Sequence, residues 1–106
     1  MNILEQFSEM TRKTAQYPIG MELPYLVLGL TGEAGEVANK VKKILRGDAQ
    51  NVPDKEIAKE LGDIYWYLDR LCHYFGTSPE QVMRGNMDKL YDRLQRNVIK
   101  GSGDSR

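Results

Sequence analysis

Four acidic side chains in two separate segments have the spacing that would let them bind a metal ion together. Glu33 and Glu36 lie three residues apart in the run GLTGEAGEVANKVKK, and Glu60 and Asp63 repeat that spacing in KELGD. On a helix, residues at i and i+3 share a face, with Cβ atoms about 5–6 Å apart. A divalent cation would offset the repulsion within each pair, and carboxylate oxygens suit Mg²⁺ or Mn²⁺. The spacing therefore predicts two helices that present their acids to one shared metal site.

A single acidic pair with this spacing is more often a solvated helix face, and neighbouring glycines strengthen the metal-site interpretation. Gly29, Gly32 and Gly35 recur every third residue, and Gly62 lies between the second pair of acids. Each glycine inside a helix costs about 0.8–1 kcal/mol relative to alanine. We expect the close approach of another backbone or of a ligand to offset that cost. The alternative is that the run GLTG forms a kink and is not helical.

Basic, polar and aromatic residues on the same helices are candidates for binding a substrate. Cations on the flanks that carry the acids would suit a polyphosphate bridging to the metal, although each alone is commonly a solvated surface charge. We expect Asn86 to be a hydrogen-bonded polar group near the core or a contact to the substrate. Trp66 falls nearly opposite the apolar stripe of its helix, where an exposed tryptophan indicates a subunit contact or a base-stacking platform. The substrate-binding candidates are Lys40, Lys43, Asn86, Lys89, Arg93 and Trp66.

The apolar periodicity predicts four helices and no strand. They are expected over residues 3–15, from residue 23 or 24 to 46, over 54–75, and from 79 to about 94, with GDAQNVPD (residues 47–54) as a loop. Ser78, Pro79 and Gln81 have the spacing of a capping box with proline in the first turn. The fold class is therefore all-α, most simply a four-helix bundle. Residues 1–99 form one domain and residues 100–106, KGSGDSR, a mobile tail.

Composition and absent motifs exclude other classes of protein and of site. Fifteen basic residues balance fifteen acidic ones, so the net charge gives no reason to expect nucleic acid or a membrane as partner. No signal peptide and no apolar run near 18 residues is apparent. Cys72 is the single cysteine, which is compatible with a cytoplasmic location. We expect Cys72 to lie in the core and His73 to lie on the surface. The sequence has no Cys/His ligand set for zinc and no Glu-x-x-His motif of a di-iron bundle. It also has no hydrolase triad and no P-loop.

The acidic motifs and their surroundings resemble the MazG-like nucleotide pyrophosphohydrolases, part of the all-α NTP pyrophosphatase superfamily. The family pattern E-E-x-x-E followed by E-x-x-D appears here as GEAGE (residues 32–36) and ELGD (residues 60–63). The segments NMDKLYDR and GSGDSR resemble the smaller single-domain branch. Gly32 stands where the pattern has its first acid, which leaves open how many metal ions bind and which carboxylate activates the water.

The resemblance implies a magnesium-dependent enzyme that cleaves a nucleoside triphosphate between the α and β phosphates, giving monophosphate and pyrophosphate. A role in cleaning the nucleotide pool is one expectation. It further implies a MazG-type helical fold completed by assembly into homodimers or homotetramers. By motif position, the metal ligands and catalytic carboxylates would be Glu33, Glu36, Glu60 and Asp63, and the phosphate contacts Lys40, Asn86, Lys89 and Arg93.

We expect in-line attack by a water molecule, with Glu36 or Glu33 accepting its proton. Two alternatives remain open at this point. Within the class, the enzyme is directed to dUTP, dCTP or phosphoribosyl-ATP. From another class, the chain is a non-catalytic helical module that dimerises and binds a nucleotide or a protein without turning it over.

Overall fold

The computed structural model describes residues 1–47 and 54–106, and this part of the chain is all-α. Its four helices are α1 (Ile3–Thr14), α2 (Glu22–Arg46), α3 (Asp54–Tyr74) and α4 (Pro79–Gln95). No strand occurs among the described residues, so the prediction of an all-α fold with four helices is confirmed. The predicted loop falls largely on residues 48–53, which lie outside the described residues.

Local sequence signals set the helix ends. Gly47 ends α2 with φ 85°, a left-handed conformation that glycine adopts without strain, and its N–H donates to the carbonyl of Ile44. Ser78 caps α4 by accepting the N–H of Gln81. The reciprocal half of the predicted capping box is missing, because the Gln81 carboxamide accepts a hydrogen bond from Thr77 instead.

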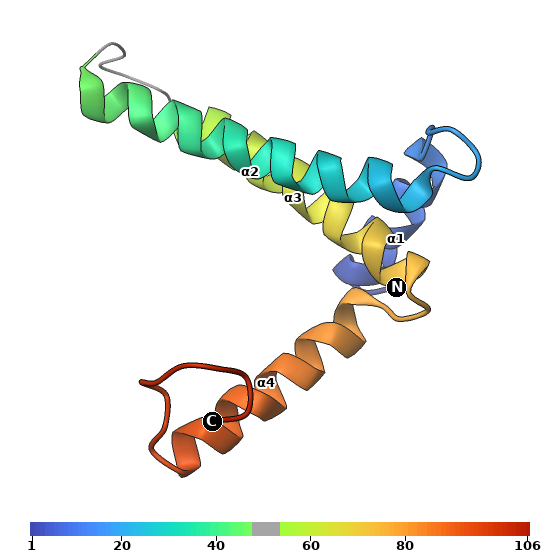
Figure 1. Cartoon of the computed structure of the whole chain (residues 1–106). Helices are drawn as coiled ribbons and strands as arrows, with labels where there is room; N and C mark the ends of the chain where they lie inside the picture. Colours follow the sequence, from blue (N-terminus) through green and yellow to red (C-terminus); the bar gives the residue numbers. More distant parts are fainter. Residues whose placement is uncertain (48–53) are drawn as a thin grey trace.

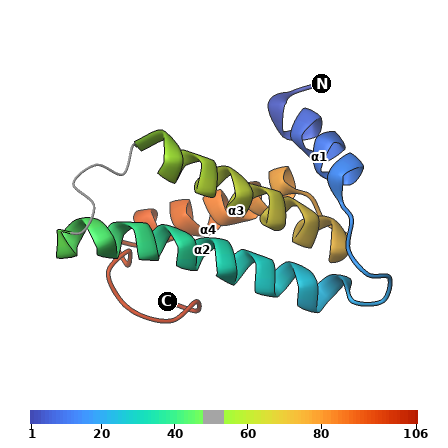
Figure 2. The same cartoon turned by 90° about the horizontal axis from the view of Figure 1, so that it is seen from above.

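The helices α2 and α3 form a long antiparallel pair, α1 packs against α3, and α4 meets α3 near the turn that joins them (Figures 1 and 2). After the turn at residues 76–78, α4 projects away from α2 (Figure 1). The radius of gyration is 17.0 Å, whereas a compact chain of this length has about 13 Å. A single copy of the chain is therefore open, with α4 standing apart from the α2–α3 pair.

The glycine-rich run lies inside α2, so GLTG is helical and not a kink. A Cβ added at Gly29 would lie 2.1 Å from the ring of Tyr67. The close neighbour at Gly29 is thus a side chain of α3, and not the backbone or the ligand that the glycines were predicted to approach. Gly32, Gly35 and Gly62 face open space within one chain.

A buried polar network fastens α1 to α3. Asp69 of α3 is 1% exposed and accepts hydrogen bonds from the hydroxyls of Ser8 and Thr11 of α1. The imidazole of His73 is exposed as predicted, but its Nε2 lies 3.4 Å from Asp69 and 3.2 Å from the Ser8 hydroxyl. The same ring nitrogen faces both partners, whereas a nucleophilic triad uses opposite nitrogens, so the network is structural.

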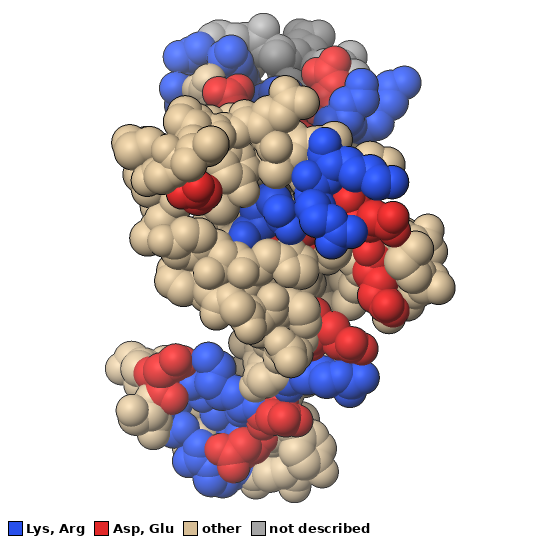
Figure 3. Space-filling view, turned by 90° about the vertical axis from the view of Figure 1, so that its right-hand side faces the viewer, with Lys and Arg blue, Asp and Glu red and all other residues tan. Residues whose placement is uncertain are grey.

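The surface carries no single-sign field on the face seen in Figure 3, where basic patches lie beside acidic ones. None of the helices in the described part of the chain combines the length and the hydropathy that a membrane span requires.

Candidate functional site

Three of the four predicted ligands meet between α2 and α3. One carboxylate oxygen from each of Glu33, Glu60 and Asp63 lies within 4.8 Å of the others, and we call these residues the acidic cluster. Glu33 comes from the middle of α2, and the two α3 acids come from successive turns of the facing helix. Glu33 and Glu60 are half-buried, whereas Asp63 is exposed. The antiparallel pairing of α2 and α3 therefore builds a set of hard oxygen ligands open to solvent on one side.

The crowding of carboxylates raises the pKa of Glu33 to about 7. The largest cause is its side-chain hydrogen bond with Glu60, followed by burial and by the charge of Asp63. The pKa of Glu60 is lowered, first by that hydrogen bond and then by Lys40, whose ammonium lies 3.1 Å from it. A proton on Glu33 and the Lys40 ammonium thus supply the positive charge that the cluster needs.

The acidic cluster fits a divalent cation. A bound Mg²⁺ or Mn²⁺ would take over the role of the proton and of the ammonium, because the ion neutralises closely spaced carboxylate oxygens. Carboxylate ligands must be deprotonated to bind it. Glu33, Glu60 and Asp63 are therefore the residues that would hold the ion, with Lys40 free to turn toward an anionic substrate.

Glu36 lies outside the acidic cluster. It is exposed, one turn along α2 from Glu33, and its charge adds to the causes that raise the pKa of Glu33. Lys43 is exposed one turn beyond Lys40. The structure thus brings three of the four predicted acids together and leaves the fourth beside them.

A pocket of about 300 Å³ opens next to the acidic cluster. Glu33 and Asp63 form part of its wall, and the remaining wall is aromatic and polar. The lining residues are Thr14, Gln16, Tyr25, Glu33, Asp63, Trp66 and Tyr67. The site therefore joins a cation-binding end to an end with aromatic rings.

The position of Trp66 corrects one expectation. Trp66 is half-buried and not exposed, because Thr14 at the end of α1 lies against it. Its indole N–H donates to the Thr14 hydroxyl at 2.8 Å, and its ring meets Tyr67 edge-on with centroids 5.0 Å apart. Tyr67 lies four residues after Asp63, on the same helix face. Tyr67 was not among the predicted site residues, although that spacing could have indicated it, whereas no signal in the sequence indicated Thr14, Gln16 or Tyr25.

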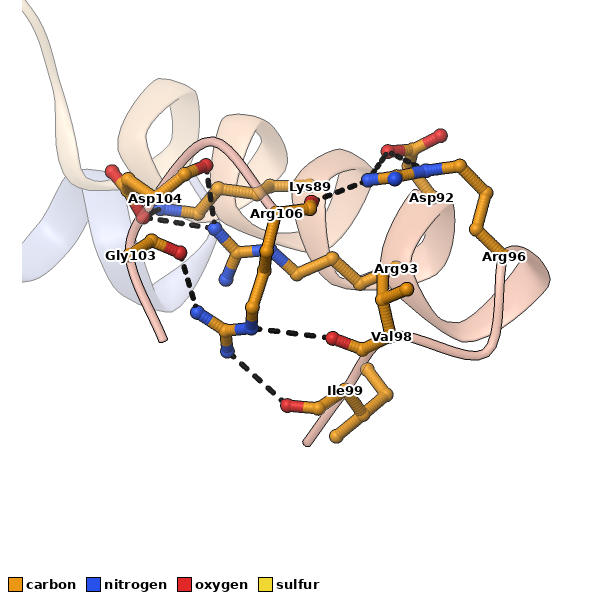
Figure 4. A network of polar contacts seen from close by, with 9 residues as sticks. All are labelled: Lys89, Asp92, Arg93, Arg96, Val98, Ile99, Gly103, Asp104 and Arg106. Atoms are coloured by element: carbon orange, nitrogen blue, oxygen red, sulfur yellow. Dashed lines mark hydrogen bonds and ion pairs between the residues drawn. The ribbon is translucent and has the colours of Figure 1, made fainter. Parts of the chain in front are cut away.

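The three candidates on α4 are not brought to the acidic cluster within one chain, because α4 projects away from α2 (Figure 1). Asn86 is exposed, which corrects its predicted position near the core, since the apolar stripe of α4 is itself uncovered. Lys89 and Arg93 bind the carboxylate of Asp104 at 3.0 and 2.9 Å. The tail that the sequence predicts to be mobile thus folds back onto α4 (Figure 4).

The protonated state of Glu33 predicts a pH-dependent metal site. We expect the affinity for Mg²⁺ to rise up to tenfold per pH unit below pH 7, and then to level off, because the proton competes with the ion. Without divalent ions, the stability of the fold changes with pH in the opposite direction to the Mg²⁺ affinity. The folded chain holds this proton more tightly than the unfolded chain does, so the free energy of unfolding falls as pH rises from about 4.5 to 7.

Calorimetric titration of Mg²⁺ at pH 5.5, 6.5 and 7.5 measures this effect. Glu33→Gln should bind Mg²⁺ more weakly and show a much flatter pH dependence. Equal slopes in the two proteins, or an affinity that does not change with pH in the wild type, would contradict the assignment of the proton to Glu33.

Comparison with family models identifies one family. A family model described as the MazG nucleotide pyrophosphohydrolase domain matches residues 23–98, which include the acidic cluster and all of α4. The chain is 47% identical over 88 residues to the Gene 37 protein of Mycobacterium phage L5, covering 79% of this chain and 76% of that protein. The phage protein's name states no substrate. No solved structure matches the chain.

Proposed function

The chain belongs to the MazG nucleotide pyrophosphohydrolase family, and from this premise we propose that it is a Mg²⁺-dependent nucleoside triphosphate pyrophosphohydrolase. One water molecule is added across the anhydride bond between the α and β phosphates, giving a nucleoside monophosphate and pyrophosphate. The observation that carries this proposal is the acidic cluster on the wall of the aromatic pocket. A cytoplasmic role in cleaning the nucleotide pool follows from the proposed substrate.

The acidic cluster would hold the ion through Glu33, Glu60 and Asp63. When bound, Mg²⁺ supplies positive charge against the phosphates and acidifies the attacking water. Glu36, which stays outside the cluster, accepts the proton of that water. Lys40 leaves Glu60 and, with Lys43, neutralises charge that develops on the pyrophosphate leaving group. Each of these roles uses a side chain of α2 or α3.

The aromatic end of the pocket suits a nucleobase. A volume of about 300 Å³ is at the lower end of the range for small-molecule sites. The indole of Trp66 is held in one orientation by Thr14, so it offers a fixed surface for stacking. We propose that the base lies against Trp66 while the phosphates extend toward Glu33 and Asp63.

We further propose that the site works in a homodimer or homotetramer. Leu26 is the one buried hydrophobic residue in the described part of the chain, and large apolar side chains on α2 and α4 are exposed. The most exposed of them are Leu28, Leu45, Tyr91 and Leu94. Burying such faces against a second copy would stabilise the open chain, and it would give α4 with Asn86, Lys89 and Arg93 a site to contact.

The assembly is tested by light scattering coupled to size exclusion. We expect a mass of at least twice 12.1 kDa at micromolar concentration. Leu28→Glu, which places a charge on the exposed α2 face, should shift the mass toward one chain. A wild-type mass of one chain across the concentrations used for activity would reject the proposed assembly.

The function is tested with a nucleotide panel in the presence of Mg²⁺, scored by pyrophosphate release. The panel contains the ribonucleoside and deoxyribonucleoside triphosphates, with dUTP and dCTP, and phosphoribosyl-ATP. Release from several triphosphates, lost when the ion is chelated, supports the proposal. Release confined to dUTP, dCTP or phosphoribosyl-ATP replaces it with the narrower enzyme. No release from any member of the panel would leave the non-catalytic module and overturn the proposal.

A further inference from the structure

The C-terminal tail, residues 100–106, covers two cations of α4 (Figure 4). The Asp104 carboxylate accepts from the Lys89 ammonium at 3.0 Å and from the Arg93 guanidinium at 2.9 Å, and its backbone carbonyl accepts from Arg93 as well. Lys89 and then Arg93 lower the pKa of Asp104. One carboxylate thus occupies both cations.

The exposure of the partners is unequal. The Arg93 side chain is 6% exposed, whereas the Asp104 side chain is 81% exposed. A buried guanidinium requires an anion beside it, because an unpaired buried charge is costly. An exposed carboxylate is readily replaced by another anion that reaches the same donors. Phosphate oxygens meet guanidinium and ammonium groups in the same way as a carboxylate does, with more acceptors to offer.

Polar contacts alone fold the tail. Residues 100–106, KGSGDSR, include no apolar side chain. The Arg106 guanidinium closes the loop by donating to the carbonyls of Val98, Ile99 and Gly103 (Figure 4). Contacts of this kind near the surface each contribute little to stability, because water competes for the same groups. An anion that takes the place of Asp104 beside Arg93 can therefore displace the tail without unfolding α4.

We propose that the tail is a displaceable cover for an anion site made by Lys89 and Arg93, and that phosphates of the substrate replace Asp104 there. This inference rests on the proposed function, in which these two cations contact the polyphosphate. The buried Arg93 is unavailable while the tail is closed, so the tail competes with the substrate for it. The chain then binds a polyphosphate only in the fraction of molecules whose tail is open, which weakens the apparent affinity by that fraction.

The test uses tripolyphosphate, the anionic part of the proposed substrate, titrated into the full chain by calorimetry and by amide NMR. We expect tripolyphosphate to shift the amide signals of Gly101 and Gly103 in the wild type. Asp104→Asn should bind tripolyphosphate about three- to tenfold more tightly, with both signals already in the released position. Arg106→Gln, which loosens the loop and leaves Asp104 in place, should change affinity in the same direction.

Asp88→Asn is the matched control, because it removes the same charge from the exposed face of α4 beside Lys89. Its affinity should rise by less than about twofold, from the loss of general repulsion alone. Glycine signals that stay unmoved at saturating tripolyphosphate would overturn the proposal and make Asp104 a permanent anchor. An equal gain in tripolyphosphate affinity in Asp88→Asn and Asp104→Asn would overturn it too. So would an absence of tripolyphosphate binding in both the wild type and Asp104→Asn.

Hydrolysis of the nucleotide panel by the wild type separates this inference from the proposed function. If the wild type hydrolyses nucleotides but tripolyphosphate does not move the tail, the proposal of a displaceable cover is rejected and the proposed enzymatic function stands. A tail that tripolyphosphate releases, without turnover of any nucleotide, supports the cover and rejects the enzyme.

Discussion

Asp63→Asn is expected to release pyrophosphate from nucleoside triphosphates more than about 100-fold more slowly than the wild type. Asp63 contributes one of the three oxygens of the acidic cluster, and an amide carries no charge to bind Mg²⁺. Residues that merely support metal ligands already change affinity or activity by about 10–100-fold when replaced. The variant should also require a higher Mg²⁺ concentration for half-maximal activity, which a titration of activity against Mg²⁺ measures.

Glu56→Gln is the matched control for this substitution. It makes the same change from acid to amide on α3, at an exposed position one turn before Glu60 and outside the acidic cluster. Its activity should stay within about twofold of the wild type. Loss of Asp63 also removes one of three crowded charges, so the free energy of unfolding without metal should not decrease. Equal losses of activity in both variants, or full activity in Asp63→Asn, would reject Asp63 as a ligand.

The helices could be predicted from the sequence because their signals are local. The 3.6-residue periodicity and the caps at Gly47 and Ser78 depend on residues within one or two turns of each other. The direction of α4 depends instead on contacts across the chain, and its apolar stripe is largely exposed in the described part of one copy. Periodicity shows that a stripe will be buried, but it does not show whether the same chain or another copy buries it.

The part of the site that could be predicted is the acidic cluster, because its position follows from the spacing of charged residues along two helices. Glu33, Glu60 and Asp63 meet because two amphipathic helices that pair along their stripes bring the flanks of those stripes together as well. Trp66 was placed wrongly because a helical projection contains no information about a third helix, and Thr14 at the end of α1 lies against that side chain. The fold of the tail depends on charge pairs between residues 11 to 15 positions apart with no helical periodicity between them.

Glu36→Gln is expected to lower kcat by about 100- to 10,000-fold, which is the contribution of a general base. Glu36 lies beside the acidic cluster and not in it, so its carboxylate is free to take a proton from water while the other three hold the ion. We therefore expect the affinity for Mg²⁺ to stay within about twofold of the wild type. This split between turnover and metal binding distinguishes Glu36 from Asp63, where both fall together.

The pH dependence of kcat gives an independent measurement of the same role. At saturating Mg²⁺ the proton on Glu33 no longer competes with the ion, so an acidic limb in the wild-type profile reports the general base, and the residual activity of Glu36→Gln should lack that limb. Glu36→Asp keeps the carboxylate but shortens its reach, so it should retain the limb with a lower maximum. A parallel loss of Mg²⁺ affinity in Glu36→Gln would make Glu36 a fourth ligand, and an unchanged kcat would leave Glu33 as the base.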